Sequence, residues 1–75
     1  MSRGSFGPLL RCRREEAHLS RATLATLAKL SEATIKFIET DRTTPSRTTL
    51  LALQSVAELH LQDEEMPPEF RESRR

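Results

Sequence analysis

Cysteine and long apolar runs are scarce in this chain, and each shortage excludes a class of protein. Cys12 is the single cysteine, so no disulfide can form within the chain, and a reducing compartment is expected. No apolar run approaches the roughly 18 residues of a transmembrane helix. The N-terminal stretch also lacks the apolar region of a secretion signal. We therefore expect a cytoplasmic protein without a membrane partner.

Aromatic residues are equally few. The chain has no Trp or Tyr, and its aromatics are Phe6, Phe37 and Phe70. A core without large rings must be built mainly from Leu, Ile and Ala, which suits packed helices. Because 75 residues make one small domain at most, that core will be modest.

Groupings of reactive side chains are missing too. Cys12, His18 and His60 have neither the spacing of metal ligands nor that of a catalytic set. The sequence contains no Gly-rich phosphate loop. We therefore expect no enzyme activity, no cofactor and no metal. We also expect Cys12 to be a partly buried helix residue and His60 to be solvated.

The charges present are unevenly distributed. Residues 1–47 carry nine Lys and Arg against five acids, or +4, whereas residues 48–75 carry three Arg against six acids, or −3. A basic front and an acidic back suit a polyanionic ligand on one side. A helical surface with ordinary solvated charges would give the same balance, so the pattern alone does not decide.

Apolar spacing and capping residues predict helices throughout the front of the chain. The first spans about residues 8–17 with Pro8 in its first turn, and His18 lies in its C-terminal cap region. Serines then precede helices at about 21–28, 32–40 and from 47 onward. A short strand near residues 59–61 remains an alternative.

These helices predict three segments. Residues 1–5 are a flexible N-terminus, residues 6–61 form the domain, and residues 62–75 are an acidic, Pro-containing tail without stable structure.

Residues 19–45 carry the most informative pattern, LSRATLATLAKLSEATIKFIETDRTTP. Two short helices separated by a turn of about four residues match a helix-turn-helix, whose second helix fits the DNA major groove. Ala25 is small enough for the helices to cross closely, with Leu24, Ala28 and Leu30 around it. Ile35 and Ile38 would dock the second helix on that floor.

The run from LRCRREEAHLSRATLATLA through LSEATIKFIETDRTTPSRTTLLAL resembles the lambda-repressor-like, Cro/C1-type (XRE-family) DNA-binding domain. The resemblance implies an all-α, compact four- to five-helix fold and a transcriptional regulator, usually a repressor acting as a homodimer on double-stranded DNA. It also implies an interior ion pair between Arg14 and Glu39, and a phosphate contact from Arg21. Departures are Lys29 and His18 where the family often has Gly, and Arg13 at an often apolar position.

Helix phase predicts the surface that contacts DNA. Glu32 is placed to accept from cytosine, Ala33 to contact a thymine methyl, and Lys36 to donate to guanine or a phosphate. Ser31 is a further phosphate contact at a helix N-terminus. The remaining candidate phosphate donors follow this helix: Arg42, Thr43, Thr44 and Arg47.

Several of these residues have a second interpretation. Glu32 is also a favourable first-turn acid without any DNA. Phe37 can fold into the core, read DNA or meet a protein partner. Arg42 and Arg47 can be solvated loop charges. The alternative function is a protein-interaction module, such as an antitoxin or adaptor, that uses Phe37 or the C-terminal tail.

Overall fold

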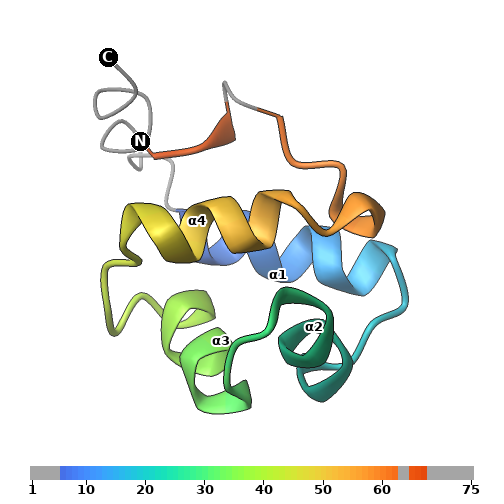
Figure 1. Ribbon diagram of the computed structural model, residues 1–75, viewed down its shortest axis with the longest axis horizontal. Helices are drawn as coiled ribbons and strands as arrows, with labels where there is room; N and C mark the ends of the chain where they lie inside the picture. Colours follow the sequence, from blue (N-terminus) through green and yellow to red (C-terminus); the bar gives the residue numbers. More distant parts are fainter. Residues whose placement is uncertain (1–5, 63–64, 68–75) are drawn as a thin grey trace.

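The computed structural model describes residues 6–62 and 65–67, and this part of the chain is all-helical (Figure 1). The helices are α1 (Phe6–Glu16), α2 (Arg21–Ala28), α3 (Glu32–Glu39) and α4 (Arg47–Gln54), followed by a 3₁₀ turn, η1 (Ala57–Leu59). The all-α class is confirmed. The short strand left open near residues 59–61 is wrong, because η1 occupies its start.

The helices α2, α3 and α4 all begin with the same serine N-cap, followed three residues later by a threonine. The residue before each helix is a serine whose Oγ accepts from the backbone N–H three residues on. The Oγ atoms of each serine and threonine also lie within 2.7–3.1 Å of one another. The pairs are Ser20 with Thr23, Ser31 with Thr34, and Ser46 with Thr49. Each helix start is therefore fixed locally by the sequence.

Three helices end in a left-handed residue that is not glycine. His18, Lys29 and Asp41, after α1, α2 and α3, all have φ near 60°. In each case the next backbone N–H returns to a carbonyl five residues earlier, at 2.8–3.1 Å, the 6→1 bond of a Schellman motif. A side chain in this conformation costs roughly 1–2 kcal/mol relative to glycine. The helices therefore end sharply but at a cost in stability.

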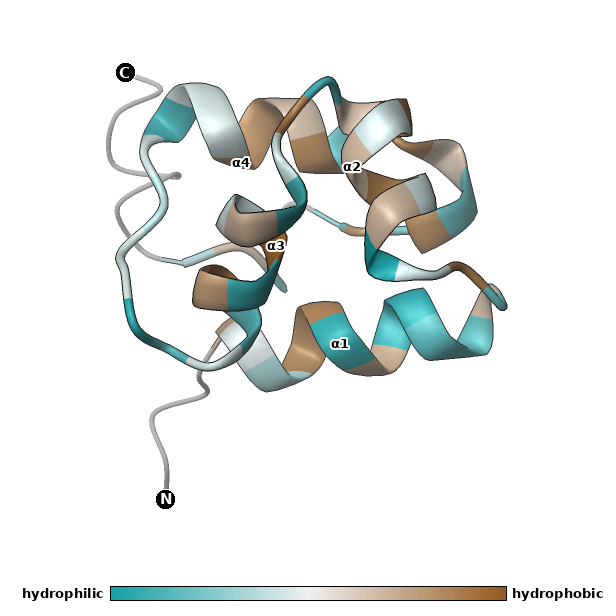
Figure 2. Ribbon diagram, turned by 90° about the horizontal axis from the view of Figure 1, so that it is seen from below, coloured by the Kyte–Doolittle hydropathy of each residue, from teal (hydrophilic) through white to brown (hydrophobic). Residues whose placement is uncertain are grey.

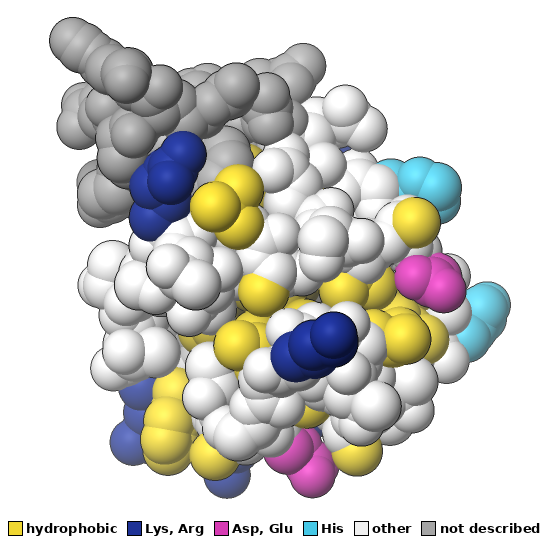
Figure 3. Space-filling view, viewed as in Figure 1, with side chains coloured by type: hydrophobic (Ala, Val, Ile, Leu, Met, Phe, Trp, Pro, Cys, Tyr) yellow, Lys and Arg dark blue, Asp and Glu magenta, His cyan; other side chains and the backbone are white. Residues whose placement is uncertain are grey.

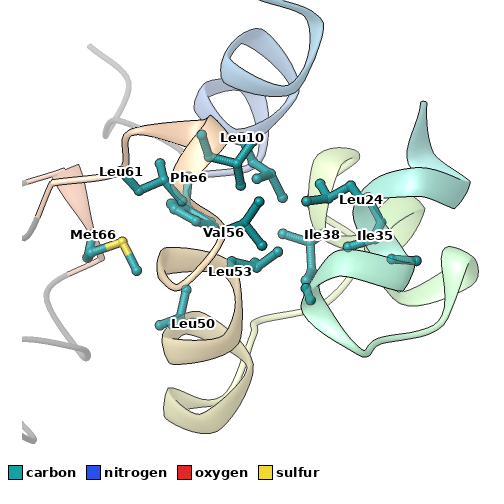
Figure 4. Close-up of a cluster of buried hydrophobic side chains, with 13 residues drawn as sticks. Phe6, Leu10, Leu24, Ile35, Ile38, Leu50, Leu53, Val56, Leu61 and Met66 are labelled. Carbon is teal, nitrogen blue, oxygen red and sulfur yellow. The ribbon is translucent and has the colours of Figure 1, made fainter. Parts of the chain in front are cut away.

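The core lies where the four α-helices and η1 converge. The buried set includes the residues expected from helix phase, Leu24, Ala25, Ala28, Ile35 and Ile38. It continues through Leu50, Leu53 and Val56, whereas Ala57 is exposed. Figure 4 shows Val56 near the centre of this set, with Phe6 and Leu10 above it, Leu53 below it and Ile38 to its right. Aliphatic side chains thus make up most of the core, and Phe6 is the buried aromatic residue in the part of the chain that the structure describes.

Residues beyond the expected end of the domain, at residue 61, also belong to the core. Met66 is only 3% exposed and lies beside Leu61 and Phe6 (Figure 4). Arg13 of α1 donates to the carbonyls of Leu59 and His60, at 3.2 and 2.8 Å, and pairs with Glu65.

Residues 65–67 therefore pack on the domain, although the sequence analysis placed them in an unstructured tail. Burial of Met66 and the Arg13 contacts supply the stabilisation that composition alone does not reveal. Residues 63–64 and 68–75 of that tail lie outside the described residues, as do residues 1–5 of the expected flexible N-terminus.

Gly7 sets the contact between α1 and the end of α3. A Cβ at this position would lie 2.9 Å from the Glu39 carbonyl oxygen, 2.7 Å from Asp41 Oδ1 and closer still to the Ile38 carbonyl oxygen. Backbone oxygens cannot move aside without distorting α3. The glycine therefore lets the two helices approach, which orients the last turn of α3.

Candidate nucleic-acid interface

The helix-turn-helix consists of α2, the turn at residues 29–31 and α3. Ala25 is buried where the helices meet, and its carbonyl accepts the Leu30 N–H at 2.8 Å. Ile35 and Ile38 are buried beneath α3. Figure 2 looks onto the unit and shows α3 between α1 and α4, with α2 to one side. The side of α3 that faces away from Ile35 and Ile38 is exposed to solvent.

That outer side contains the residues expected to read DNA. All five are solvent-exposed: Ser31, Glu32, Ala33, Lys36 and Phe37. Phe37 is 44% exposed, which excludes the interpretation that it folds into the core. In Figure 3, basic and apolar side chains adjoin an acidic one along the lower edge, in the region where Figure 1 draws α3. The surface offers donors, an acceptor and apolar contacts together.

The loop after α3 adds exposed polar groups. Arg42, Thr43 and Thr44 follow the left-handed Asp41, and Arg47 is the first residue of α4. The Arg42 N–H donates to the Phe37 carbonyl at 2.8 Å, which ties the start of the loop to α3. Four exposed candidate phosphate donors therefore follow the C-terminal end of α3 in the sequence.

Arg14 and Glu39 are in direct contact. Arg14 Nε lies 2.7 Å from Glu39 Oε2 and Arg14 Nη2 lies 3.1 Å from Oε1, so the pair is bidentate. The Glu39 side chain is 0% exposed and that of Arg14 is 11% exposed. Arg14 Nη1 also donates to the Leu19 carbonyl at 2.9 Å. Hydrogen bonding to Glu39 raises the pKa of Arg14, so Arg14 stays charged, and the pair fastens α3 to α1.

Glu39 has a second cationic partner that the sequence analysis missed. Arg21 Nε donates to Glu39 Oε1 at 3.1 Å, and the Arg21 side chain is 31% exposed. Sequence reasoning assigned Arg21 to a DNA phosphate alone. The available signal was that Arg21 starts the helix packed on α3. One carboxylate therefore connects α1, α2 and α3.

Cys12 differs from expectation, because it is exposed on α1 rather than partly buried. Its Sγ lies 3.6 Å from Glu16 Oε2, and the negative charge of Glu16 raises the pKa of the thiol. Among the described residues, no group of His, Cys, Asp or Glu is arranged to hold a metal. Within the same residues, no helix is long and apolar enough to cross a membrane.

Comparison with known proteins gives one family. The family model described as "Helix-turn-helix domain" matches residues 5–67, which includes the buried Met66 as well as the four helices. No curated protein and no solved structure matches the chain significantly.

Proposed function

Because the chain belongs to the helix-turn-helix domain family, a DNA-binding family, we propose that it is a sequence-specific transcriptional regulator, specifically a repressor of the Cro/C1 (XRE) type. In this proposal α3 enters the major groove and α2 lies across the backbone. The observation that carries it is the two-sided character of α3. Ile35 and Ile38 hold one side in the core, and the other side presents exposed, chemically varied groups.

Base reading would come from the first turns of α3. Glu32 accepts from cytosine N4, Ala33 contacts a thymine methyl and Lys36 donates to guanine. Phe37, exposed on the same helix, packs on a second thymine methyl. Glu32 repels phosphates unless it meets its cytosine, so it contributes selectivity rather than affinity. A mismatched base pair in a site of this kind typically costs about 1–3 kcal/mol of binding free energy.

Affinity would come mainly from phosphate contacts around α3. Ser31 lies at its N-terminus, Arg21 at the start of α2, and the exposed loop donors follow its C-terminus. These donors are Arg42, Thr43, Thr44 and Arg47. Every phosphate neutralised by a cation releases counterions, so binding should weaken steeply with salt.

We further propose that the protein binds as a homodimer. One copy offers few base contacts, and two copies related by a two-fold axis would read half-sites about one helical turn apart. The outer side of α4 supports a contact surface, because Leu51 is 41% exposed there. The expected interface runs from this side of α4 to about Leu61.

Fluorescence anisotropy with a labelled random-sequence duplex pool tests the proposal. The pool is titrated with protein over a range of salt, and bound duplexes are recovered and sequenced. Salt-sensitive binding with a two-fold symmetric enriched motif is the expected result. Absence of binding at low salt contradicts the proposal. Sedimentation of the complex on the enriched duplex then measures whether two copies bind.

A second candidate is a protein-interaction module. Leu27 on α2 and Phe37 on α3 are each 44% exposed, and such apolar side chains also suit a protein partner. The two functions respond differently to substitution. If DNA is the ligand, replacing Lys36 with Ala should weaken or abolish DNA binding. If a protein is the ligand, Phe37→Ala should weaken binding to that protein strongly, whereas Lys36→Ala should change it little.

A further inference from the structure

We propose that Glu39 is a positioning residue for DNA binding, holding Arg21 so that its guanidinium faces a backbone phosphate. This inference rests on the proposed function and assigns a role in it to a buried carboxylate. Arg21 would then be more than a free surface cation. It would be a hydrogen-bond donor to phosphate whose orientation is fixed by its contact with Glu39.

The geometry behind Arg21 is rigid. The Glu39 carboxylate is fully buried, and Arg14 engages both of its oxygens. Arg14 is itself fixed by the Leu19 carbonyl. Arg21 approaches this anchored group through Nε, with Nε to Oε1 at 3.1 Å. A carboxylate held in this way has little freedom to follow Arg21, so it fixes the direction of the Arg21 side chain.

The charges leave Arg21 with capacity for a second anion. Two arginines share one carboxylate, so the cluster carries a net charge of +1, and Arg14 alone already satisfies Glu39 with its bidentate pair. No hydrogen bond from Arg21 Nη1 or Nη2 to another described residue is present. These two nitrogens belong to a side chain that is 31% exposed, which allows them to reach solvent or a ligand.

The position of Arg21 favours phosphate as that anion. Arg21 is the first residue of α2, where backbone N–H groups of the opening turn lack partners within the helix. The helix dipole adds positive potential at this end. A planar guanidinium with two donors on its far edge matches the oxygens of a phosphate. α2 is also the helix proposed to lie across the DNA backbone.

Arginine and lysine are not equivalent in this arrangement. Arginine can donate Nε–H to Glu39 while its terminal nitrogens bind phosphate. Lysine has one nitrogen, which cannot present a planar fork to phosphate while bound to Glu39. Fixing the side chain before binding also removes part of the entropy cost of ordering it on DNA. The proposal therefore predicts that charge alone is insufficient at residue 21.

The test compares Arg21→Lys and Arg21→Ala with the wild-type chain on the enriched duplex. Arg11→Lys is the matched control, because Arg11 is on α1 in an exposed pair with Glu15, outside the proposed interface. All affinities are measured by fluorescence anisotropy, under conditions in which circular dichroism shows that each variant is folded. We expect Arg21→Lys to weaken binding about three- to tenfold. We expect the control to stay within about twofold of wild type.

Two results would overturn the inference while leaving the proposed function intact. Wild-type affinity in Arg21→Lys would show that charge alone matters, and wild-type affinity in Arg21→Ala would show that Arg21 serves only Glu39. A wild-type chain that binds no duplex would instead overturn the proposed function as well. NMR supplies a readout beyond affinity. The Arg21 Nε–H should be protected from exchange in both free and bound protein, and its loss on DNA binding would contradict the positioning role.

Discussion

Replacing Glu39 with Ala should destabilise the protein strongly, even without DNA. The substitution removes a carboxylate that is 0% exposed and leaves Arg14, only 11% exposed, without its bidentate partner. It also removes the acceptor for Arg21 Nε. Breaking a buried pair by deleting one partner costs about 3–5 kcal/mol, because the remaining charge is poorly solvated.

That cost is large for a chain of this size. At about 0.05–0.15 kcal/mol per residue, 75 residues have a total unfolding free energy of about 4–11 kcal/mol. Each kcal/mol shifts the melting temperature of such a domain by about 4–8 °C. The variant should therefore melt at least about 12 °C lower than wild type.

The assay is thermal and urea unfolding followed by far-UV circular dichroism, because the chain has no Trp or Tyr for intrinsic fluorescence. Arg11→Ala is the control, since Arg11 pairs with Glu15 at the surface, where both side chains are more than half exposed. Such a pair is worth about 0–1 kcal/mol. Equal destabilisation by the two substitutions would refute the argument from burial.

Three further predictions concern single sites. Gly7→Ala should destabilise by about 1–3 kcal/mol in urea unfolding, because the methyl would meet the Ile38 carbonyl; stabilisation, as helix propensity alone predicts, would contradict this. His18→Gly should raise the melting temperature by about 4–16 °C by relieving a left-handed side chain, and an unchanged value would argue against strain there. Glu16 raises the pKa of the Cys12 thiol, so Glu16→Gln should lower that pKa and speed alkylation by iodoacetamide near neutral pH; an unchanged rate would remove Glu16 as the cause.

Local rules explain what could be predicted from the sequence. Ser20, Ser31 and Ser46 mark helix starts because an N-cap depends on neighbours three residues away. Helix phase likewise separates buried Ile35 and Ile38 from the exposed residues of α3. The all-α fold and the solvent exposure of the candidate DNA-reading residues follow from such short-range information. Their contacts with DNA stay predictions.

Contacts between distant residues explain what sequence reasoning missed. Arg13 meets the carbonyls of Leu59 and His60, and nothing near Arg13 in the chain indicates this. Burial of Met66 depends on that same return of the chain. Gly7 is required by backbone atoms of α3 more than thirty residues away. Residues 62–75 are polar enough for a tail, and composition could not show that part of them packs.

The most direct test of the central claim is to compare the sequences selected by wild type and by Glu32→Ala. Glu32 is exposed at the first position of α3, where a recognition helix meets base edges. If α3 reads the major groove, wild type should enrich a two-fold symmetric motif. Glu32→Ala should then lose preference at one base pair in each half-site and keep the rest of the motif. An identical motif from both proteins, or no motif from wild type, would contradict the account.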